Sequence, residues 1–115
     1  MWISIHSSTS FNRGDVVEYS AGTLSILAAP TDSVYGVVGR VQTQEDGSFM
    51  IRLHTAGDVE AKASRAIPDD GGTLGLEVGG VYVDPAPAIP RGIVSPLPAG
   101  QSSRAAGDLV LIHLR

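Results

Sequence analysis

The chain contains 115 residues, carries a net charge of −4 and has no cysteine. The length predicts one domain, and the absence of cysteine excludes disulfides, thiolate metal sites and a cysteine nucleophile. The negative charge disfavours binding to nucleic-acid phosphates. No apolar stretch is long enough to span a membrane, and the first fourteen residues do not read as a signal peptide.

Residues 1–13 (MWISIHSSTSFNR) differ from the rest of the chain, because they hold the only tryptophan and a run of serines and threonine. Alternation of Trp2, Ser4 and His6 with two isoleucines predicts a strand. The polar run makes this segment separable from a single β domain at 14–115. Two interpretations are open: an extended arm that docks on another chain, or a first strand that completes the sheet. For docking, the candidate anchors are Trp2, Ile3, Ile5 and Phe11.

The following residues predict an all-β domain of short antiparallel strands. Val, Ile and Thr supply 26 of the 115 residues, and these β-branched side chains favour a pleated sheet. Frequent glycines and prolines interrupt the apolar runs, and no window has the periodicity of an amphipathic helix. Many short strands with frequent turns indicate a small barrel or sandwich. We expect the first strands at 16–19 and 23–27.

A hairpin is the clearest single element. Val34–Thr43 and Phe49–Thr55 flank a turn that contains Asp46-Gly47, and Asp-Gly between β-rich runs is a strong hairpin signal. In the second strand, alternation predicts that Phe49, Ile51, Leu53 and Thr55 face the core, whereas Met50, Arg52 and His54 face the other side.

The C-terminal half predicts a strand at 59–63 and further strands at 73–76, 81–83, 93–95 and 109–114. The proline-rich stretch 84–92 (DPAPAIPRG) predicts an extended loop. A Gly-Asp phrase at 14–15, 57–58 and 107–108 precedes a strand each time. We interpret it as a turn that the aspartate stabilises through nearby backbone.

No motif for catalysis, metal binding or phosphate binding was found. His6, His54 and His113 lie in no nucleophile or metal-ligand signature, and Asp69-Asp70 beside Gly71-Gly72 predicts a solvated turn. We therefore expect a protein that is not an enzyme and needs no metal or cofactor. Lys62, the only lysine, loosely resembles the modified lysine of biotinyl and lipoyl carrier domains. A carrier or ligand-binding β-barrel is therefore one alternative.

Three phrases carry a second resemblance: Gly14-Asp15-Val16-Val17, the stretch 34–39 (VYGVVG), and the closing segment from Gly92 to Leu114, which includes GDLVLIHL. Across residues 14–114 they resemble the small head decoration, or capsid cement, proteins of tailed bacteriophages. In that family a glycine-led strand is followed by a small-residue turn, and the chain ends on an alternating apolar strand. The stretch 84–98 is richer in proline than the family pattern.

This resemblance implies a β-barrel or β-tulip-like fold and a non-enzymatic role on the outer capsid surface of the virion. The implied partner is the major capsid protein, whose subunit contacts would be reinforced. A homo-oligomer is also implied, with a trimer favoured. The residues would also suit another virion module, such as a tail, baseplate or head-fibre base.

Overall fold

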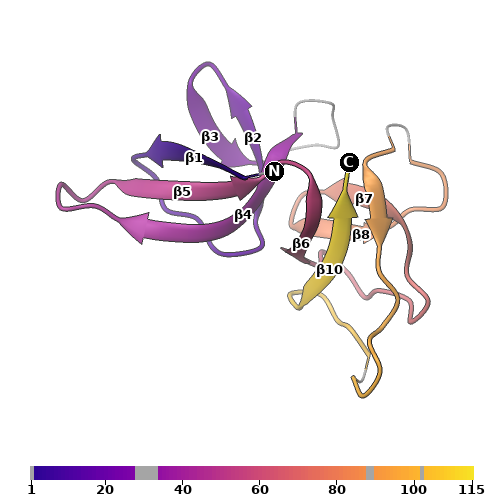
Figure 1. Ribbon diagram of the computed structural model, residues 1–115. Coiled ribbons are helices and arrows are strands. Elements are labelled where there is room, and N and C mark those ends of the chain that lie inside the picture. The colour runs from indigo at the N-terminus through magenta and orange to yellow at the C-terminus, as the bar shows by residue number, and fades with distance from the viewer. Residues whose placement is uncertain (1, 28–33, 88–89, 102) are drawn as a thin grey trace.

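The computed structural model describes residues 2–27, 34–87, 90–101 and 103–115, and these form two five-stranded antiparallel sheets. The sheets lie side by side along the molecule, with the chain passing from the first into the second (Figure 1). The described residues contain no helix, and so none that could cross a membrane. The all-β prediction is confirmed.

The first sheet comes from the N-terminal half of the chain. Its order is β1 (Trp2–Ser7), β5 (Phe49–His54), β4 (Val34–Thr43), β2 (Val16–Ser20) and β3 (Thr23–Ile26). The β4–β5 hairpin forms as expected, and Gly47 adopts φ 84° in its turn. Ile51 and Leu53 are buried and Phe49 is half-buried. The predicted core-facing side of β5 is therefore confirmed.

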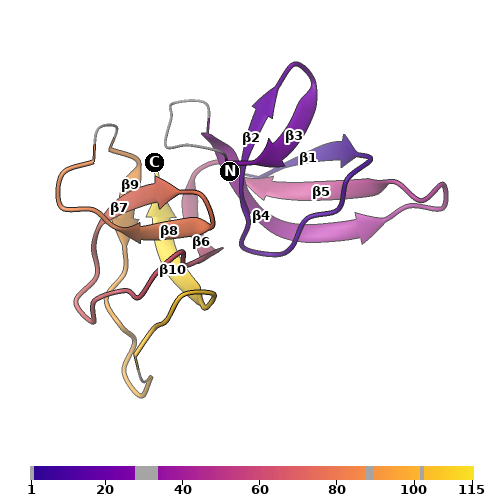
Figure 2. The same cartoon turned by 180° about the vertical axis from the view of Figure 1, so that it is seen from behind.

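The second sheet comes from the C-terminal half. Its order is β6 (Gly57–Lys62), β10 (Leu109–Leu114), β9 (Gly92–Val94), β7 (Gly72–Glu77) and β8 (Gly80–Val83). Figure 2 shows this half of the molecule from behind, with β7 and β8 in front of β10. Its edges approach each other just beyond β6, where Ala63 forms a single parallel bridge with Val81. One bridge does not make a ladder, so the described strands form no closed barrel.

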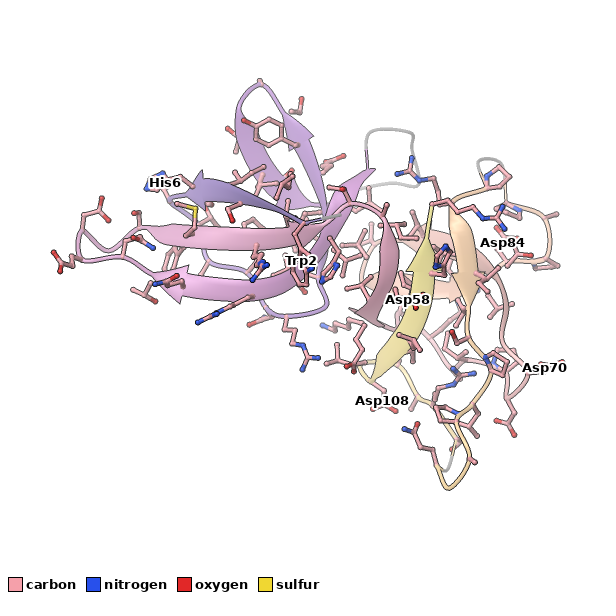
Figure 3. All side chains as sticks on the ribbon, in the orientation of Figure 1. Trp2, His6, Asp58, Asp70, Asp84 and Asp108 are labelled. Atoms are coloured by element: carbon pink, nitrogen blue, oxygen red, sulfur yellow. The ribbon has the colours of Figure 1, made fainter. Side chains whose placement is uncertain are left out.

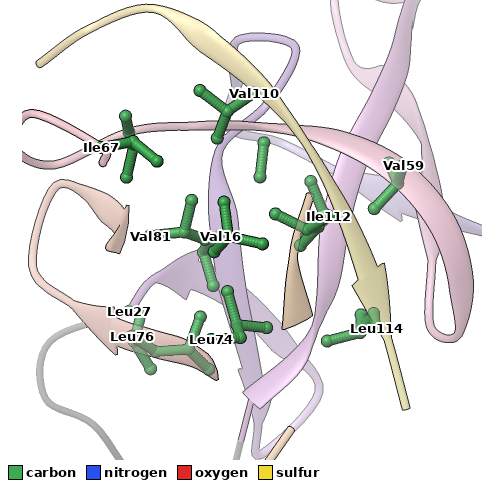
Figure 4. Close-up of a cluster of buried hydrophobic side chains, with 14 residues drawn as sticks. Val16, Leu27, Val59, Ile67, Leu74, Leu76, Val81, Val110, Ile112 and Leu114 are labelled. Atoms are coloured by element: carbon green, nitrogen blue, oxygen red, sulfur yellow. The ribbon is translucent and has the colours of Figure 1, made fainter. Parts of the chain in front are cut away.

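Two clusters of buried apolar side chains hold the sheets. Among the described residues, the large cluster has 14 buried members (Figure 4), of which three come from the first sheet or the residue after it: Val16, Leu27 and Val37. The small cluster has six and lies on the opposite face of the first sheet: Phe11, Val17, Leu24, Val38, Ile51 and Leu53. Because the large cluster contains side chains from both sheets, the burial of these side chains holds the two sheets together.

The Gly-Asp phrase explains how the two sheets are connected. Gly14 (φ 92°) donates its N–H to the Val38 carbonyl at 2.8 Å and accepts the Lys62 N–H at 2.9 Å, so it links β4 to β6. The Asp15 carboxylate accepts the Asn12 N–H at 2.8 Å. The Asp108 carboxylate accepts the N–H of residue 105 in the same way, at 2.9 Å. The turn interpretation is confirmed at these two places, whereas the third aspartate, Asp58, contacts His113 instead.

A candidate partner-binding surface on the first sheet

The N-terminal segment is an edge strand. Every residue of β1 pairs with β5, from Trp2 opposite His54 to Ser7 opposite Phe49. Of the two interpretations that the sequence left open, the structure therefore has the first strand that completes the sheet. In the sheet order β1 has β5 as its only neighbour, so its other backbone edge pairs with no described strand.

The four candidate anchors lie in different surroundings. Trp2 is exposed over 43% of its surface, and Phe11 over only 8%. Ile3 and Ile5 are half-buried and pack against the small cluster. Three of the four anchors therefore help to hold the first sheet together, and Trp2 alone presents a large exposed apolar surface.

Trp2 belongs to a row of side chains that crosses the sheet on one face. Trp2 lies opposite His54, His54 opposite Val37, and Val37 opposite Val16. The last two are buried in the large cluster, against the second sheet. Trp2 lies at the end of β1 nearest to the second sheet and His6 at the far end (Figure 3). We call the part of this side around Trp2 the Trp2 face; its residues are exposed or half-buried and comprise Trp2, Ser4, Arg40, Gln42, Met50, Arg52 and His54.

The Trp2 indole is fixed by its neighbours. A Cβ atom at Gly39 would lie 2.6 Å from the indole Cζ3 atom, so the ring occupies the space that the missing side chain leaves. The His54 ring touches the indole from the opposite strand. The Arg52 guanidinium carbon lies 4.3 Å from the indole centroid, which is a cation–π geometry. The exposed indole therefore packs against three neighbours of its own sheet.

A shallow hollow of about 320 Å³ opens beside the indole. Arg40 and Arg52 lie opposite each other on β4 and β5 and supply its charge. No carboxylate of the described residues lines the hollow. Its lining residues are Trp2, Ile3, Ser4, Arg40, Gln42, Met50 and Arg52. The arrangement is a cationic, aromatic surface on a chain whose net charge is −4.

His54 adds a titratable group to this surface. Burial lowers the pKa of His54 below its ordinary value of 6.5, and the positive charge of Arg52 lowers it further. Both causes disfavour the imidazolium. His54 therefore stays neutral to lower pH than an unperturbed histidine, and it serves the Trp2 face as a packing surface for the indole.

Of the other histidines, His6 lies on the same side of β1 as Trp2 and Ser4, opposite Met50 but at the far end of the strand, whereas His113 lies in β10 of the second sheet. His6 Nε2 lies 2.7 Å from the Ser48 hydroxyl, and His113 Nδ1 lies 2.9 Å from the Asp58 carboxylate. Within the described ranges, no three or more His, Asp or Glu residues are grouped so that they could hold a metal ion.

Lys62 is the last residue of β6 and lies opposite Leu109, in a strand rather than at a hairpin tip. It lines a separate hollow of about 560 Å³ near the junction of the sheets. Phe11, Leu24 and Ile26 supply apolar surface to the same hollow. The hollow lined by Lys62 shares no residue with the Trp2 face.

Sequence reasoning missed the arginines and Gly39. Alternation placed Arg52 on the non-core side of its strand, which is a weak signal for this site. The pairing of β1 with β5, which joins residues about fifty positions apart, is not encoded by any local pattern. Comparison of the chain with known proteins finds no matching family model, no matching curated protein and no matching solved structure.

Proposed function

We propose that this protein is a structural protein of a tailed-phage virion, which binds the outer surface of the capsid and reinforces contacts between major capsid protein subunits. The proposal assigns it no catalytic step and no cofactor. The β-tulip-like architecture and the trimer implied by the resemblance to decoration proteins belong to the same proposal.

One observation carries it: an exposed tryptophan beside arginine, on a strand whose outer backbone edge pairs with no described strand. Trp and Arg are the residue types that most often dominate binding energy at protein interfaces. Trp2 is fixed by Gly39, His54 and Arg52, so little conformational entropy is lost when a partner covers it. The free edge of β1 offers backbone groups to an extended segment of the partner.

Such a protein stabilises a shell by mass action. A ligand that binds the assembled lattice better than the loose subunits shifts the equilibrium toward the lattice by its differential affinity. Several copies around a symmetric position add their contacts through effective concentration. The second sheet, which packs against the first through the large cluster, would then support the Trp2 face without taking part in the contact.

The test uses purified expanded heads that lack this protein, from the phage that encodes it. We expect the full chain to co-sediment with these heads and Trp2→Ala to bind at least about tenfold more weakly, because an interface tryptophan often contributes more than 2 kcal/mol. Tyr19→Ala is the matched control, since Tyr19 is an aromatic residue of the same sheet with 40% exposure and lies outside the Trp2 face. Equal affinity of Trp2→Ala and the wild type for heads would contradict the proposal.

Deletion of residues 1–13 is a poor substitute for the point variant, because it removes a paired strand and the buried Phe11. Electron microscopy of virions separates the proposal from its alternatives. Density on the shell supports decoration, whereas density on the tail, baseplate or a head fibre supports another virion module. A carrier role through Lys62 predicts a mass adduct on protein isolated from the native host.

A further inference from the structure

We propose that the hollow on the Trp2 face binds an extended, acidic segment of the partner protein, whose carboxylates meet Arg40 and Arg52. The identity of that partner as the capsid rests on the proposed function. The chemistry of the site does not, because it follows from the charges on β4 and β5.

The two arginines are placed in an unfavourable pair. Arg40 and Arg52 are directly opposite each other across the β4–β5 ladder, and like charges at opposite positions destabilise a sheet. Neither arginine forms an ion pair with a described carboxylate. By contrast, Arg13 pairs with Glu60 at 2.9 Å, and Arg65 pairs with Glu77. A carboxylate from outside would supply the missing counter-charge.

The geometry favours a carboxylate over another acceptor. Each guanidinium is planar and can bind a carboxylate through two parallel N–H groups. Arg52 already stacks on the indole, at 4.3 Å from the centroid, and this contact limits its rotamers. Strand spacing places side chains of residues i and i+2 about 7 Å apart on one face. A segment with acidic residues at alternate positions can therefore reach both arginines.

The apolar part of the lining selects a polypeptide over a mineral anion. Trp2 and Met50 contribute carbon surface beside the charges, and the polar side chains of Ser4 and Gln42 can meet backbone groups of an extended segment. A bare anion would leave that surface uncovered. Aliphatic parts of glutamate side chains would cover it.

A nucleic acid fits this surface less well. Nucleic-acid binding generally uses a basic stripe that neutralises several phosphates, and here two arginines lie on a chain of net charge −4. A second copy of this chain could also present an acid, for example at the exposed Glu45-Asp46 turn. The experiment below distinguishes binding of a nucleic acid, and association with a second copy, from binding of an acidic partner segment.

The single tryptophan makes the site directly measurable. Trp2 is the only Trp in the chain, so its fluorescence reports on the hollow without a label. We expect a hexaglutamate peptide at low ionic strength to change the Trp2 emission saturably, and hexalysine to leave it unchanged. Arg52→Gln and Arg40→Gln should each lower the affinity for hexaglutamate by about tenfold, which is the usual effect of losing one charged hydrogen-bond pair.

Arg115→Gln is the matched control, because it removes the same charge from the C-terminal residue and should retain wild-type affinity. Urea unfolding checks that the variants fold. Arg40→Gln removes one of two opposed like charges and should leave the midpoint unchanged or raise it, whereas Arg52→Gln also loses the cation–π contact with Trp2 and should change the midpoint only slightly. A second readout is the salt dependence of the peptide affinity, whose slope should fall in each of the two variants.

Four results would overturn the inference. They are the absence of a saturable emission change with hexaglutamate, an equal loss of affinity in Arg115→Gln, tighter binding of an oligothymidylate than of the peptide, and self-association that Arg52→Gln abolishes. Head binding that depends on Trp2 without any peptide binding would remove this inference and leave the proposed function intact. Peptide binding without head binding would leave this inference intact and remove the proposed function.

Discussion

The two sheets bury their apolar residues in different ways. The second sheet directs one face of its strands into the large cluster, and its edges approach at the Ala63–Val81 bridge. The first sheet divides its burial between two faces: Val16 and Val37 enter the large cluster, whereas Val17 and Val38 enter the small one. Beyond the junction, no described segment covers the Trp2 face, where Trp2, Arg40 and Arg52 are exposed. The second sheet therefore forms a packed body, and the first sheet forms a platform that projects from it.

Glycines serve the two sheets differently as well. Gly80 lies in β8 at φ 138°, and a Cβ atom there would overlap the Lys62 carbonyl oxygen. Gly39 lies in β4, and a Cβ atom there would meet the far end of the Trp2 ring. The first glycine permits a close backbone approach between strands, and the second makes room for one exposed side chain.

The largest expected effect compares the two cores with the same substitution. Ile112 and Ile51 are both fully buried, one in each cluster. We expect Ile112→Ala to lower the free energy of unfolding by about 3–5 kcal/mol and Ile51→Ala by about 2–3 kcal/mol, because the smaller cluster can collapse more completely around the cavity. Urea unfolding measures both. An equal or reversed order would mean that the first sheet is packed as firmly as the second.

The glycine pair gives the next effect. Gly80→Ala should cost about 2–4 kcal/mol, since it combines a left-handed φ with a backbone overlap. Gly39→Ala should cost less than about 1 kcal/mol because the Trp2 side chain can move away, yet it should shift the Trp2 emission. Thermal unfolding and fluorescence test the two variants together. A large stability loss in Gly39→Ala would show that the indole is structural rather than merely accommodated.

A smaller effect concerns pH. Because the folded-state pKa of His54 lies below 6.5, the unfolded chain takes up its proton at higher pH than the folded chain does. The contribution of His54 to stability is therefore complete above pH 6.5 and is lost as the pH falls from 6.5 through the folded-state pKa. Urea midpoints between pH 7.5 and 4.5 should decline, and His54→Gln should reduce the decline. An unchanged slope in that variant would contradict the assignment.

Asp46 should affect stability in a lower pH range than His54. The Ser48 hydroxyl and backbone N–H donate to its carboxylate and lower its pKa below 3.8. Its contribution is therefore lost only as the pH falls below about 3.8. Asp46→Asn should leave the decline between pH 7.5 and 4.5 unaltered.

The smallest effect concerns the ion pair that joins the N-terminal segment to the second sheet. Arg13 and Glu60 form it with exposed side chains. We expect Arg13→Gln to change the unfolding free energy by less than about 0.5 kcal/mol, as exposed pairs usually do. Differential scanning calorimetry in low and high salt checks this value, and a loss above 1 kcal/mol would give the pair a role in fixing the two sheets.

Much of the fold could be predicted because its signals are local. The hairpin follows from Asp46-Gly47 between two β-rich runs, and the alternation in Phe49–His54 places Ile51 and Leu53 inward. The candidate site was only partly predictable. Trp2 was visible as the lone tryptophan, but Phe11, Ile3 and Ile5 were assigned to the same surface although they pack on the small cluster.

By itself the sequence determined the strands and turns, since backbone preferences and alternation act over a few residues. It also determined the lack of disulfides and the acidic net charge. Tertiary structure alone decided that β1 pairs with β5 and that Arg40 meets Arg52 across the ladder. Strand pairing joins distant residues at a loop-closure cost that no local pattern records, and the Trp2 face exists only through that pairing.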